Sequence, residues 1–426
     1  MSQKFLQAEM DNSSIIDEAK WSWRNAVSMG LIDEDDTSVL FQSWDRLKLY
    51  TQHLIDSFSH PNALHAVAIK TQPHPKVLER IVDWGLGLEA ASMEEVKKAL
   101  NAGVSPDKIV FDSPVKTKKE ILYCHEKVKG IRLNVNSIEE LNRIPENPNF
   151  QVGIRINPQV ETGAPEVYDV SNDESKFGVP ISEKDIIINA IIKYPVTLLH
   201  IHSGSQMANL DSAINAICLL RDIALEANHR LQSDGSSRRI QTLDIGGGLV
   251  PEKLILGQTS KMQEYASSLR LRCPELWEFE LITEFGQWNY FYTGYAISKI
   301  EYSILKGTKY ITYIHIGADF LLRDAYVKPR GISFNVLDSN ANPKTTKKVV
   351  HDIAGPLCFA GDYLAKNIEL PVAEESDLLL LTGTGSNSYG LWSRHCSRSI
   401  PSFFGVDFKN KELDKLSSRV NLFAEI

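Results

Sequence analysis

The sequence predicts an α/β protein in which an eight-stranded parallel (β/α)8 barrel is followed by a β-rich second domain. Eight short, almost continuously apolar runs alternate with helical patterns between residues 65 and 285. Such runs are typical of parallel strands that are buried on both faces. Beyond residue 290 the helical patterns stop and β-rich segments with turn signals follow. A chain of 426 residues is too long for one ordinary core and fits two domains.

The candidate barrel strands share their apolar character and are each followed by a segment that can form a helix. They are HAVAIK (65–70), LGLEAA (86–91), KIVF (108–111), IRLNV (131–135), QVGIRI (151–156), TLLHIH (197–202), IQTLDI (240–245) and FELITEF (279–285). Between them, PKVLERIVDWG (75–85) and MEEVKKALNAG (93–103) place apolar residues at helical spacing and end in glycine, a helix stop signal. Eight such units favour a closed barrel, and an open doubly wound sheet is the alternative.

The barrel is expected to span residues 46–288, and the second domain residues 289–426. The second domain is expected to be an antiparallel sheet or a sandwich. Its β-rich segments are 296–304, 309–318, 332–338, 347–355 and 377–385. Residues 1–45 are helical in part, and we expect them to pack on the β domain.

Composition excludes several classes of protein. The net charge is −8 and no long basic run occurs, which argues against a nucleic-acid partner. No stretch approaches the roughly 20 apolar residues that span a bilayer. The N-terminal residues lack the apolar region of a secretory signal, so we expect a cytoplasmic protein. The five cysteines are scattered, which predicts reduced thiols with no disulfide framework and no metal site.

Residues that can bind ligands or take part in catalysis follow the ends of the barrel strands. Barrel enzymes have their active sites at these ends. They are Lys70, Glu89, Ser92, Asn157, His202, Ser203, Gly204, Ser205, Gly246, Gly247, Gly248 and Glu284. Taken singly, a strand-end lysine is usually a solvated charge, a glycine triplet can be only a tight turn, and a strand histidine usually belongs to the core. Together, a lysine, a phosphate cradle and a carboxylate for a ring nitrogen are what pyridoxal phosphate (PLP) needs.

Several motifs occur in the order found in one known family. They are AVAIKTQPHPKVL (66–78), RINP (155–158), SKFG (175–178), HIHSGSQ (200–206), DIGGG (244–248) and GPLCFAGD (355–362). With them the chain resembles the fold-type III PLP-dependent decarboxylases, the group of diaminopimelate, ornithine and biosynthetic arginine decarboxylases. The resemblance covers residues 60–410, is nearest to the diaminopimelate branch, and implies an alanine-racemase-like barrel.

The resemblance implies a role for each cofactor-binding residue. Lys70 would form the Schiff base with PLP, and His202 would stack on the ring. Glu284 would pair with the pyridinium nitrogen. Ser205 would hold the phosphate together with Gly246, Gly247 and Gly248.

The resemblance also implies a homodimer with shared active sites. Cys358 would reach the site from the partner subunit and donate a proton to the carbanion that CO2 loss leaves behind. His202 and Lys70 would complete the catalytic set.

Three departures from the family pattern affect binding. The stretch EFGQ (284–287) places neutral Gln287 where the family has an arginine for the phosphate. Asn387 stands where a tyrosine usually touches the phosphate, although Tyr389 is close enough in sequence to substitute. Phe359 replaces the acidic residue beside the cysteine that recognises a distal amino group.

The substrate is indicated by ADFLLRDAY (318–326), which resembles the diaminopimelate-type stretch that grips a far carboxylate. Arg323 and Tyr326 would bind that carboxylate, since a guanidinium binds it in bidentate fashion. We therefore expect an amino-acid decarboxylase for an atypical substrate with a carboxylated or otherwise anionic far end. The alternative is a catalytically silent, decarboxylase-like binding or regulatory protein; a racemase is a minor third option.

Overall fold

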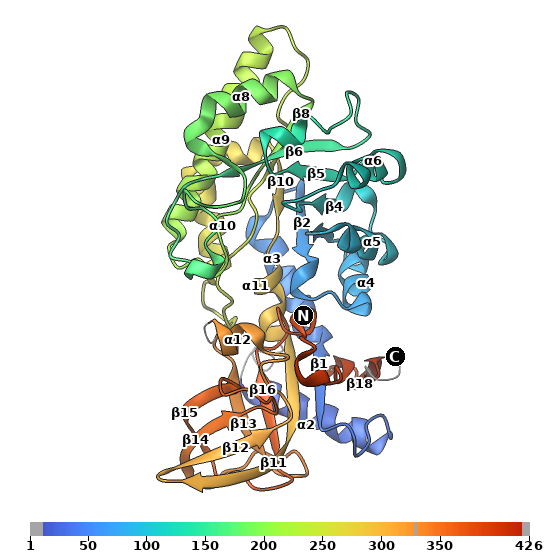
Figure 1. The fold of residues 1–426 in the computed structure, drawn as a ribbon, viewed down its shortest axis with the longest axis vertical. Helices are drawn as coiled ribbons and strands as arrows, with labels where there is room; N and C mark the ends of the chain where they lie inside the picture. The colour runs from blue at the N-terminus through green and yellow to red at the C-terminus, as the bar shows by residue number, and fades with distance from the viewer. Residues whose placement is uncertain (1–11, 328–329, 420–426) are drawn as a thin grey trace. The chain divides into compact units, whose positions relative to one another are not determined.

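The computed structural model describes residues 12–327 and 330–419. The chain divides into two compact units (Figure 1). The barrel unit comprises His53–Glu252 and Thr259–Trp288, and the β unit comprises Met1–Gln52, Lys253–Gln258 and Asn289–Ile426. The domain boundaries expected after residues 45 and 288 stay a prediction.

The barrel unit is built around eight parallel strands that close on themselves. They are β2 (Ala63–Ala68), β3 (Gly87–Ala90), β4 (Ile109–Phe111), β5 (Arg132–Val135), β6 (Gln151–Asn157), β8 (Val196–Ile201), β9 (Thr242–Asp244) and β10 (Glu280–Thr283). Their order is β5-β4-β3-β2-β10-β9-β8-β6, and a β5–β6 pairing closes the ring. The predicted closed barrel is therefore confirmed, and the open sheet is excluded. The two-residue strand β7 (Val179–Pro180) pairs with β6 outside the ring.

Helices surround these strands because each helix has one apolar face that must be buried. They are α4 (Pro75–Asp83), α5 (Met93–Asn101), α6 (Lys118–Lys127), α7 (Ile138–Leu141), α8 (Lys184–Lys193), α9 (Leu210–Ser233) and α10 (Lys261–Arg272). Helices α3 (Trp44–Phe58) and α11 (Gly286–Tyr290) each run across the boundary between the two units. Figure 1 shows α4 to α6 on one side of the strands and α8 to α10 on the other. Within residues 12–327 and 330–419, no helix is long and apolar enough to cross a membrane.

The β unit is a mixed sheet organised by one long strand, β11 (Gly294–Lys306). The first half of β11 pairs with β1 (Ser38–Ser43) and β16 (Leu378–Thr382), and its second half pairs with β12 (Lys309–Ile314). The remaining strands are β13 (Ser333–Leu337), β14 (Lys348–Ala354), β15 (Tyr363–Pro371), β17 (Ser402–Asp407) and β18 (Glu412–Ser417). The second domain was expected to be an antiparallel sheet or a sandwich. Its sheet instead contains two parallel pairs, β1–β17 and β12–β14.

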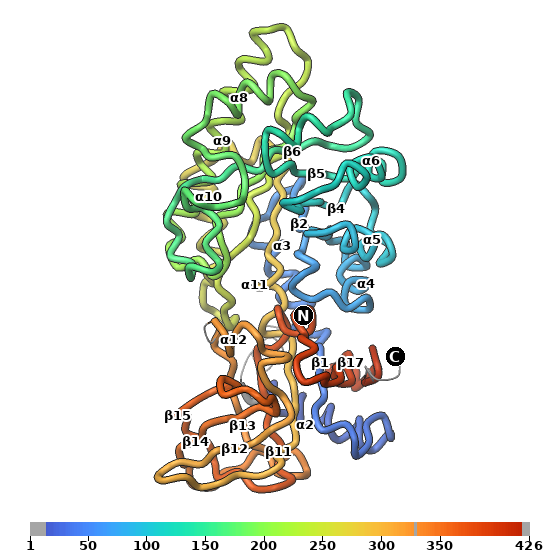
Figure 2. The backbone as a smooth tube through the Cα atoms, in the orientation of Figure 1, coloured from blue at the N-terminus to red at the C-terminus, as the bar shows by residue number. Residues whose placement is uncertain are grey.

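The N-terminal segment supplies one of these parallel pairs, because β1 inserts between β11 and β17. Figure 2 shows the blue trace of β1 beside the red trace of β17. Helix α2 (Asn12–Ser28) buries Ile15, Ala19 and Trp23 in the same apolar core as Tyr295 and Phe404.

Candidate active site

Lys70 projects from the end of β2, in the short turn Ile69–Thr71. Its ammonium Nζ donates to Glu89 Oε2 on β3 at 2.9 Å. The Lys70 side chain is 52% exposed, whereas the Glu89 side chain is fully buried. Desolvation lowers the pKa of Lys70, but the negative charges of Glu89 and Glu284 outweigh it and hold the pKa above its ordinary value. The site therefore presents an accessible amine with a buried carboxylate behind it.

Glu284 follows β10 directly and is buried. Burial, together with the negative charges of Asp244, Glu89 and Asp112, raises the pKa of Glu284 well above its ordinary value. Its Oε1 atom has no hydrogen-bond partner within the part of the chain that the structure describes. A buried carboxyl group left in this way is costly unless another group satisfies it. Glu284 can therefore hold a proton or face a cationic ring atom in the site.

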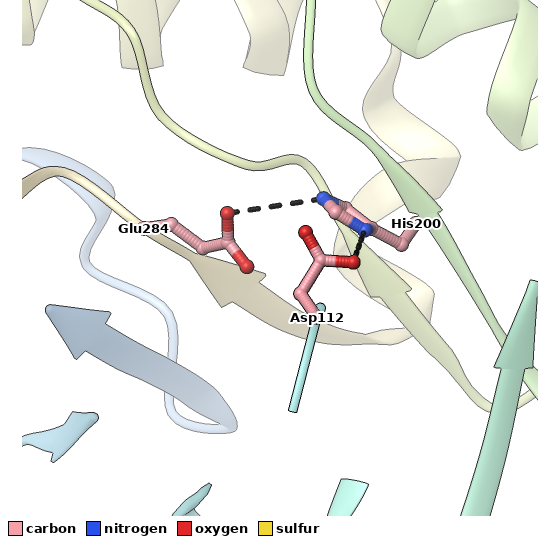
Figure 3. Close-up of side chains that lie close together, drawn as sticks. All are labelled: Asp112, His200 and Glu284. Carbon is pink, nitrogen blue, oxygen red and sulfur yellow. Dashed lines mark hydrogen bonds and ion pairs between the residues drawn. The ribbon is translucent and has the colours of Figure 1, made fainter. Parts of the chain in front are cut away.

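A buried chain of polar groups lies behind Glu284 (Figure 3). His200 on β8 uses Nδ1 to contact Asp112 Oδ1 at 3.1 Å, and its Nε2 lies 3.8 Å from Glu284 Oε2. Arg155 Nη1 on β6 donates to Asp112 Oδ2 at 3.0 Å. His200 and Arg155 outweigh burial and hold the pKa of Asp112 below its ordinary value. The positive charge of Arg155 thus balances part of the acidic cluster from within the barrel.

Three of these buried polar residues were not predicted as site residues from the sequence. Arg155 and His200 lie inside the quoted motifs RINP and HIHSGSQ, and Asp112 directly follows a buried strand. The signal that could have identified them is a charged or polar residue at an inward position of an otherwise apolar barrel strand.

His202 lies two residues beyond His200, just after β8. Its Nδ1 accepts a hydrogen bond from the N–H of Gly247 at 3.2 Å. Desolvation, followed by the positive charges of Arg155 and Lys70, lowers the pKa of His202 well below its ordinary value. His202 is therefore a neutral ring, fixed in orientation by the glycine turn.

The turn Gly246–Gly248 follows β9 and passes close to the ends of β8 and β10. Gly246 and Gly248 have φ values of +65° and +102°. A Cβ at Gly246 would lie 2.6 Å from the carbonyl oxygen of Ile201, and one at Gly247 would lie 2.5 Å from that of Glu284. Only glycine fits this path, which brings bare backbone next to His202 and Glu284.

Two further cofactor residues predicted from the sequence flank this turn. A Cβ at Gly248 would meet the carbonyl oxygen of Gly204, the residue before Ser205. Gln287 lies on α11, directly after Glu284–Gly286, and is buried. The Gln287 Nε2 donor has no hydrogen-bond partner among the described residues. The backbone of Gly204 thus lies beside the glycine turn, and the buried Gln287 amide keeps an unpartnered donor among the described residues.

The barrel residues fit PLP on these observations. An accessible amine, a turn that only glycine can form and a buried carboxyl group with one unpartnered oxygen suit the cofactor's aldehyde, phosphate and ring nitrogen.

The predicted substrate residues lie in the β unit. Cys358 is exposed. The ring of the next residue, Phe359, stacks on Tyr326 with centroids 5.2 Å apart and planes 5° apart. Arg323 lies on α12 (Leu322–Tyr326), three residues before Tyr326. The structure thus joins Tyr326 to the segment beside Cys358, a contact between distant parts of the sequence.

Asn387 and Tyr389, the two candidates for the missing phosphate tyrosine, are placed differently from each other. Asn387 is buried at φ +52°, and its Nδ2 has no hydrogen-bond partner among the described residues. The ring of Tyr389 stacks on Phe403 at 5.5 Å.

Comparisons with known proteins agree with this geometry. Residues 47–289 match the family of the pyridoxal-dependent decarboxylases, in its pyridoxal binding domain. A diaminopimelate decarboxylase of Zymomonas mobilis is 25% identical over 84% of this chain and 83% of its own length.

Solved structures share the fold. The diaminopimelate decarboxylase of Helicobacter pylori, complexed with L-lysine, matches with a TM-score of 0.81 at 22% identity, covering 94% of this chain and 98% of that one. The arginine decarboxylase of Paramecium bursaria Chlorella virus matches with a TM-score of 0.76 at 18% identity, covering 91% and 100%.

Proposed function

The chain belongs to the pyridoxal-dependent decarboxylases, and from this premise we propose that its substrate is an amino acid with an anionic far end that lacks an ammonium group. The coarser function needs no proposal: the protein is a PLP-dependent carboxy-lyase that acts on an amino acid. The catalytically silent alternative has no support from the relatives.

The cofactor half of the proposal assigns the barrel residues. Lys70 would hold PLP through its aldehyde, His202 would stack on its ring, and Glu284 would pair with its ring nitrogen. Gly246–Gly248 and Ser205 bind the phosphate through backbone and hydroxyl donors. PLP, when bound, supplies an electron sink for the pair released as CO2 leaves. The raised pKa of Glu284 supports its role, because it keeps a proton available where the ring nitrogen needs one.

Gln287, Asn387 and Tyr389 complete the proposed phosphate site. The unpartnered amide donors of Gln287 and Asn387 support this, since each can donate to a phosphate oxygen without breaking another hydrogen bond. A neutral amide contributes less than the charged arginine it replaces. We therefore expect weaker PLP affinity than an arginine at residue 287 would give.

The protonation step is assigned to Cys358 in a homodimer with shared sites. Exposure of the Cys358 thiol supports this assignment, because an exposed thiol can reach a site on a partner subunit. In this arrangement Cys358 delivers the proton that replaces the departing CO2, and a monomer is inactive.

The observation that carries the substrate proposal is the stack of Phe359 on Tyr326. The residue beside Cys358 offers an aromatic ring and no carboxylate, so a distal ammonium would lose its ionic partner there. Arg323, one helical turn before Tyr326, offers a guanidinium for a carboxylate. The diaminopimelate decarboxylases among the relatives act on a substrate with both groups at its far end, and this chain keeps a partner for only one of them.

A CO2-release assay tests the proposal. The panel comprises dicarboxylic amino acids without a second amine, meso-diaminopimelate, and amino acids with a distal ammonium alone. We expect the first class to have the highest kcat/KM. A preference for diaminopimelate would refute the substrate assignment and leave the decarboxylase standing.

A matched pair of variants at residue 359 isolates the charge. Phe359→Glu should shift kcat/KM toward substrates with a distal ammonium by about 10- to 100-fold, the worth of one charged hydrogen bond. Phe359→Leu removes the ring and adds no charge, so it should cause no such shift. Equal preferences in the two variants would mean that residue 359 does not contact the far end of the substrate.

A further inference from the structure

Two cysteines far from the cofactor residues lie together on the helical shell of the barrel unit. Cys218 lies in the middle of α9, and Cys273 caps the end of α10. The sulfur of Cys218 donates to the carbonyl oxygen of Arg272, the residue before Cys273, at 3.8 Å. The two side chains lie close enough for each thiol to act on the pKa of the other. Helix packing thus brings together two thiols that are distant in sequence.

The two thiols differ in access. Cys218 is half-buried and can meet a small molecule from solvent, whereas Cys273 is fully buried. A partly exposed thiol backed by a buried one has the arrangement of an attacking and a resolving cysteine.

The charges around the pair favour a thiolate at Cys218. The hydrogen bond from Cys273 lowers the pKa of Cys218 to about 7, with smaller contributions from Arg221 and Arg272. The hydrogen bond with Cys218 correspondingly raises the pKa of Cys273.

Both arginines are held in place. Arg221 Nε donates to Asp222 at 2.8 Å, and Arg272 Nη1 donates to Asp211 at 2.6 Å. The buried hydroxyl of Tyr265 also lies within electrostatic range of Cys218. The Asp222 and Asp211 carboxylates hold the two guanidinium groups in place and also offset part of their positive charge near Cys218.

We propose that Cys218 and Cys273 form a peroxide-reactive thiol pair that closes to a reversible disulfide between α9 and the end of α10. This inference is independent of the cofactor and substrate assignments. In the first step the Cys218 thiolate attacks one oxygen of hydrogen peroxide, which breaks the O–O bond, gives a sulfenic acid and releases hydroxide. In the second step the Cys273 sulfur attacks the sulfenic sulfur, the S–S bond forms and water leaves. A thiol reductant restores both thiols.

The disulfide would close a loop that contains β9, the Gly246–Gly248 turn and α10. A covalent link across this segment restricts the unfolded chain and so stabilises the folded one. Oxidised protein should therefore unfold at a higher temperature than reduced protein, and a thiol reductant should reverse the difference.

The test treats the full-length, cofactor-loaded protein with hydrogen peroxide, blocks the remaining thiols by alkylation, and maps peptides without reduction. We expect a linked pair of peptides that contain Cys218 and Cys273, lost on reduction. Cys218→Ser should abolish the link, whereas Cys396→Ser, which removes an exposed thiol of the β unit, should leave it intact.

A second variant, Cys273→Ser, tests the first step alone, in case strain in the helices prevents the disulfide from forming. In this variant the sulfenic acid of Cys218 has no resolving thiol and should accumulate. A cyclic dione, which reacts with sulfenic acids, then labels it. Two results together would overturn the proposal. The wild-type protein would give no linked peptide, and in Cys273→Ser the dione would label Cys218 no faster than buried Cys124.

Discussion

The cofactor end of the barrel unit and the Cys358 segment of the β unit are organised in opposite ways. In the barrel, Glu89, Asp112 and Glu284 are buried and are connected to Lys70, Arg155 and His200 by hydrogen bonds or charge. In the β unit, Cys358 is exposed, and its neighbour Phe359 packs against the rings of Tyr326 and His395. The first region is preorganised by its own chain, whereas the second presents its reactive group outward.

This difference separates two functions that an active site usually combines. Apart from the proposed phosphate contacts of Asn387 and Tyr389, cofactor binding should depend on barrel residues that one chain already holds in place. Protonation and recognition of the substrate's far end should depend on the exposed segment, and under the homodimer proposal on a second subunit. Variants in the two regions should therefore fail in different ways.

The largest effect is expected in the barrel. Lys70→Ala should remove both the visible absorbance of bound PLP and all CO2 release, because it removes the amine assigned to the aldehyde of PLP. Lys76→Ala is the matched control, since Lys76 forms an exposed ion pair with Glu79 on α4. If Lys70→Ala retained the absorbance, Lys70 would not be the residue that carries PLP.

Cys358→Ala should leave the absorbance unchanged and slow turnover by about 100-fold or more, the usual worth of a positioned proton donor. Cys396→Ala, at another exposed cysteine of the same unit, should change neither quantity. Steady-state CO2 release and product analysis measure the effect. Unchanged turnover and product would remove Cys358 from the mechanism and break the contrast between the regions.

Gln287→Arg should tighten PLP binding by about 5- to 10-fold, because a charged hydrogen bond to the phosphate, worth roughly 1 kcal/mol more, replaces a neutral one. Gln287→Leu, similar in size and without a donor, should weaken binding. Equilibrium titration of the apoprotein with PLP measures both. Similar affinities in the two variants would show that residue 287 does not contact the phosphate.

The smallest effect concerns pH. Because the pKa of Lys70 lies above its ordinary value, the neutral amine that reacts with an aldehyde is scarce near neutrality. Each pH unit below that pKa lowers the neutral fraction about tenfold, so PLP uptake should quicken as pH rises. Glu89→Gln removes the ion pair, lowers the pKa and should speed uptake at neutral pH. The rate of PLP uptake is measured against pH, and a rate that does not rise with pH would contradict the account.

The barrel was predictable from the sequence because its strands are buried on both faces and so leave continuous apolar runs. The same logic located Lys70, His202, the glycine turn and Glu284, since a strand end in such a barrel points to the site. It did not identify Asp112, Arg155 and His200, because polar groups inside apolar strands are recognised only once their partners are known.

The β unit was harder to predict. Strands β1, β15, β17 and β18 were not predicted. Strands β15 and β18 are partly exposed edge strands that lack a continuous apolar run. Strands β1 and β17 are buried inside the sheet, but their apolar runs are only two or three residues long. The parallel pairing of β1 with β17 joins the two ends of the chain, which no local pattern indicates. The stack of Tyr326 on Phe359 is likewise a long-range contact that depends on the folded sheet.

The most direct test of the central claim is to reduce the cofactor-loaded protein with borohydride and map the labelled peptide by mass spectrometry. Reduction makes the bond between cofactor and protein permanent, so the label marks the amine that carries PLP. The account predicts one pyridoxyl group per chain, attached to Lys70. A label on any other lysine, or none in protein that releases CO2, would contradict it.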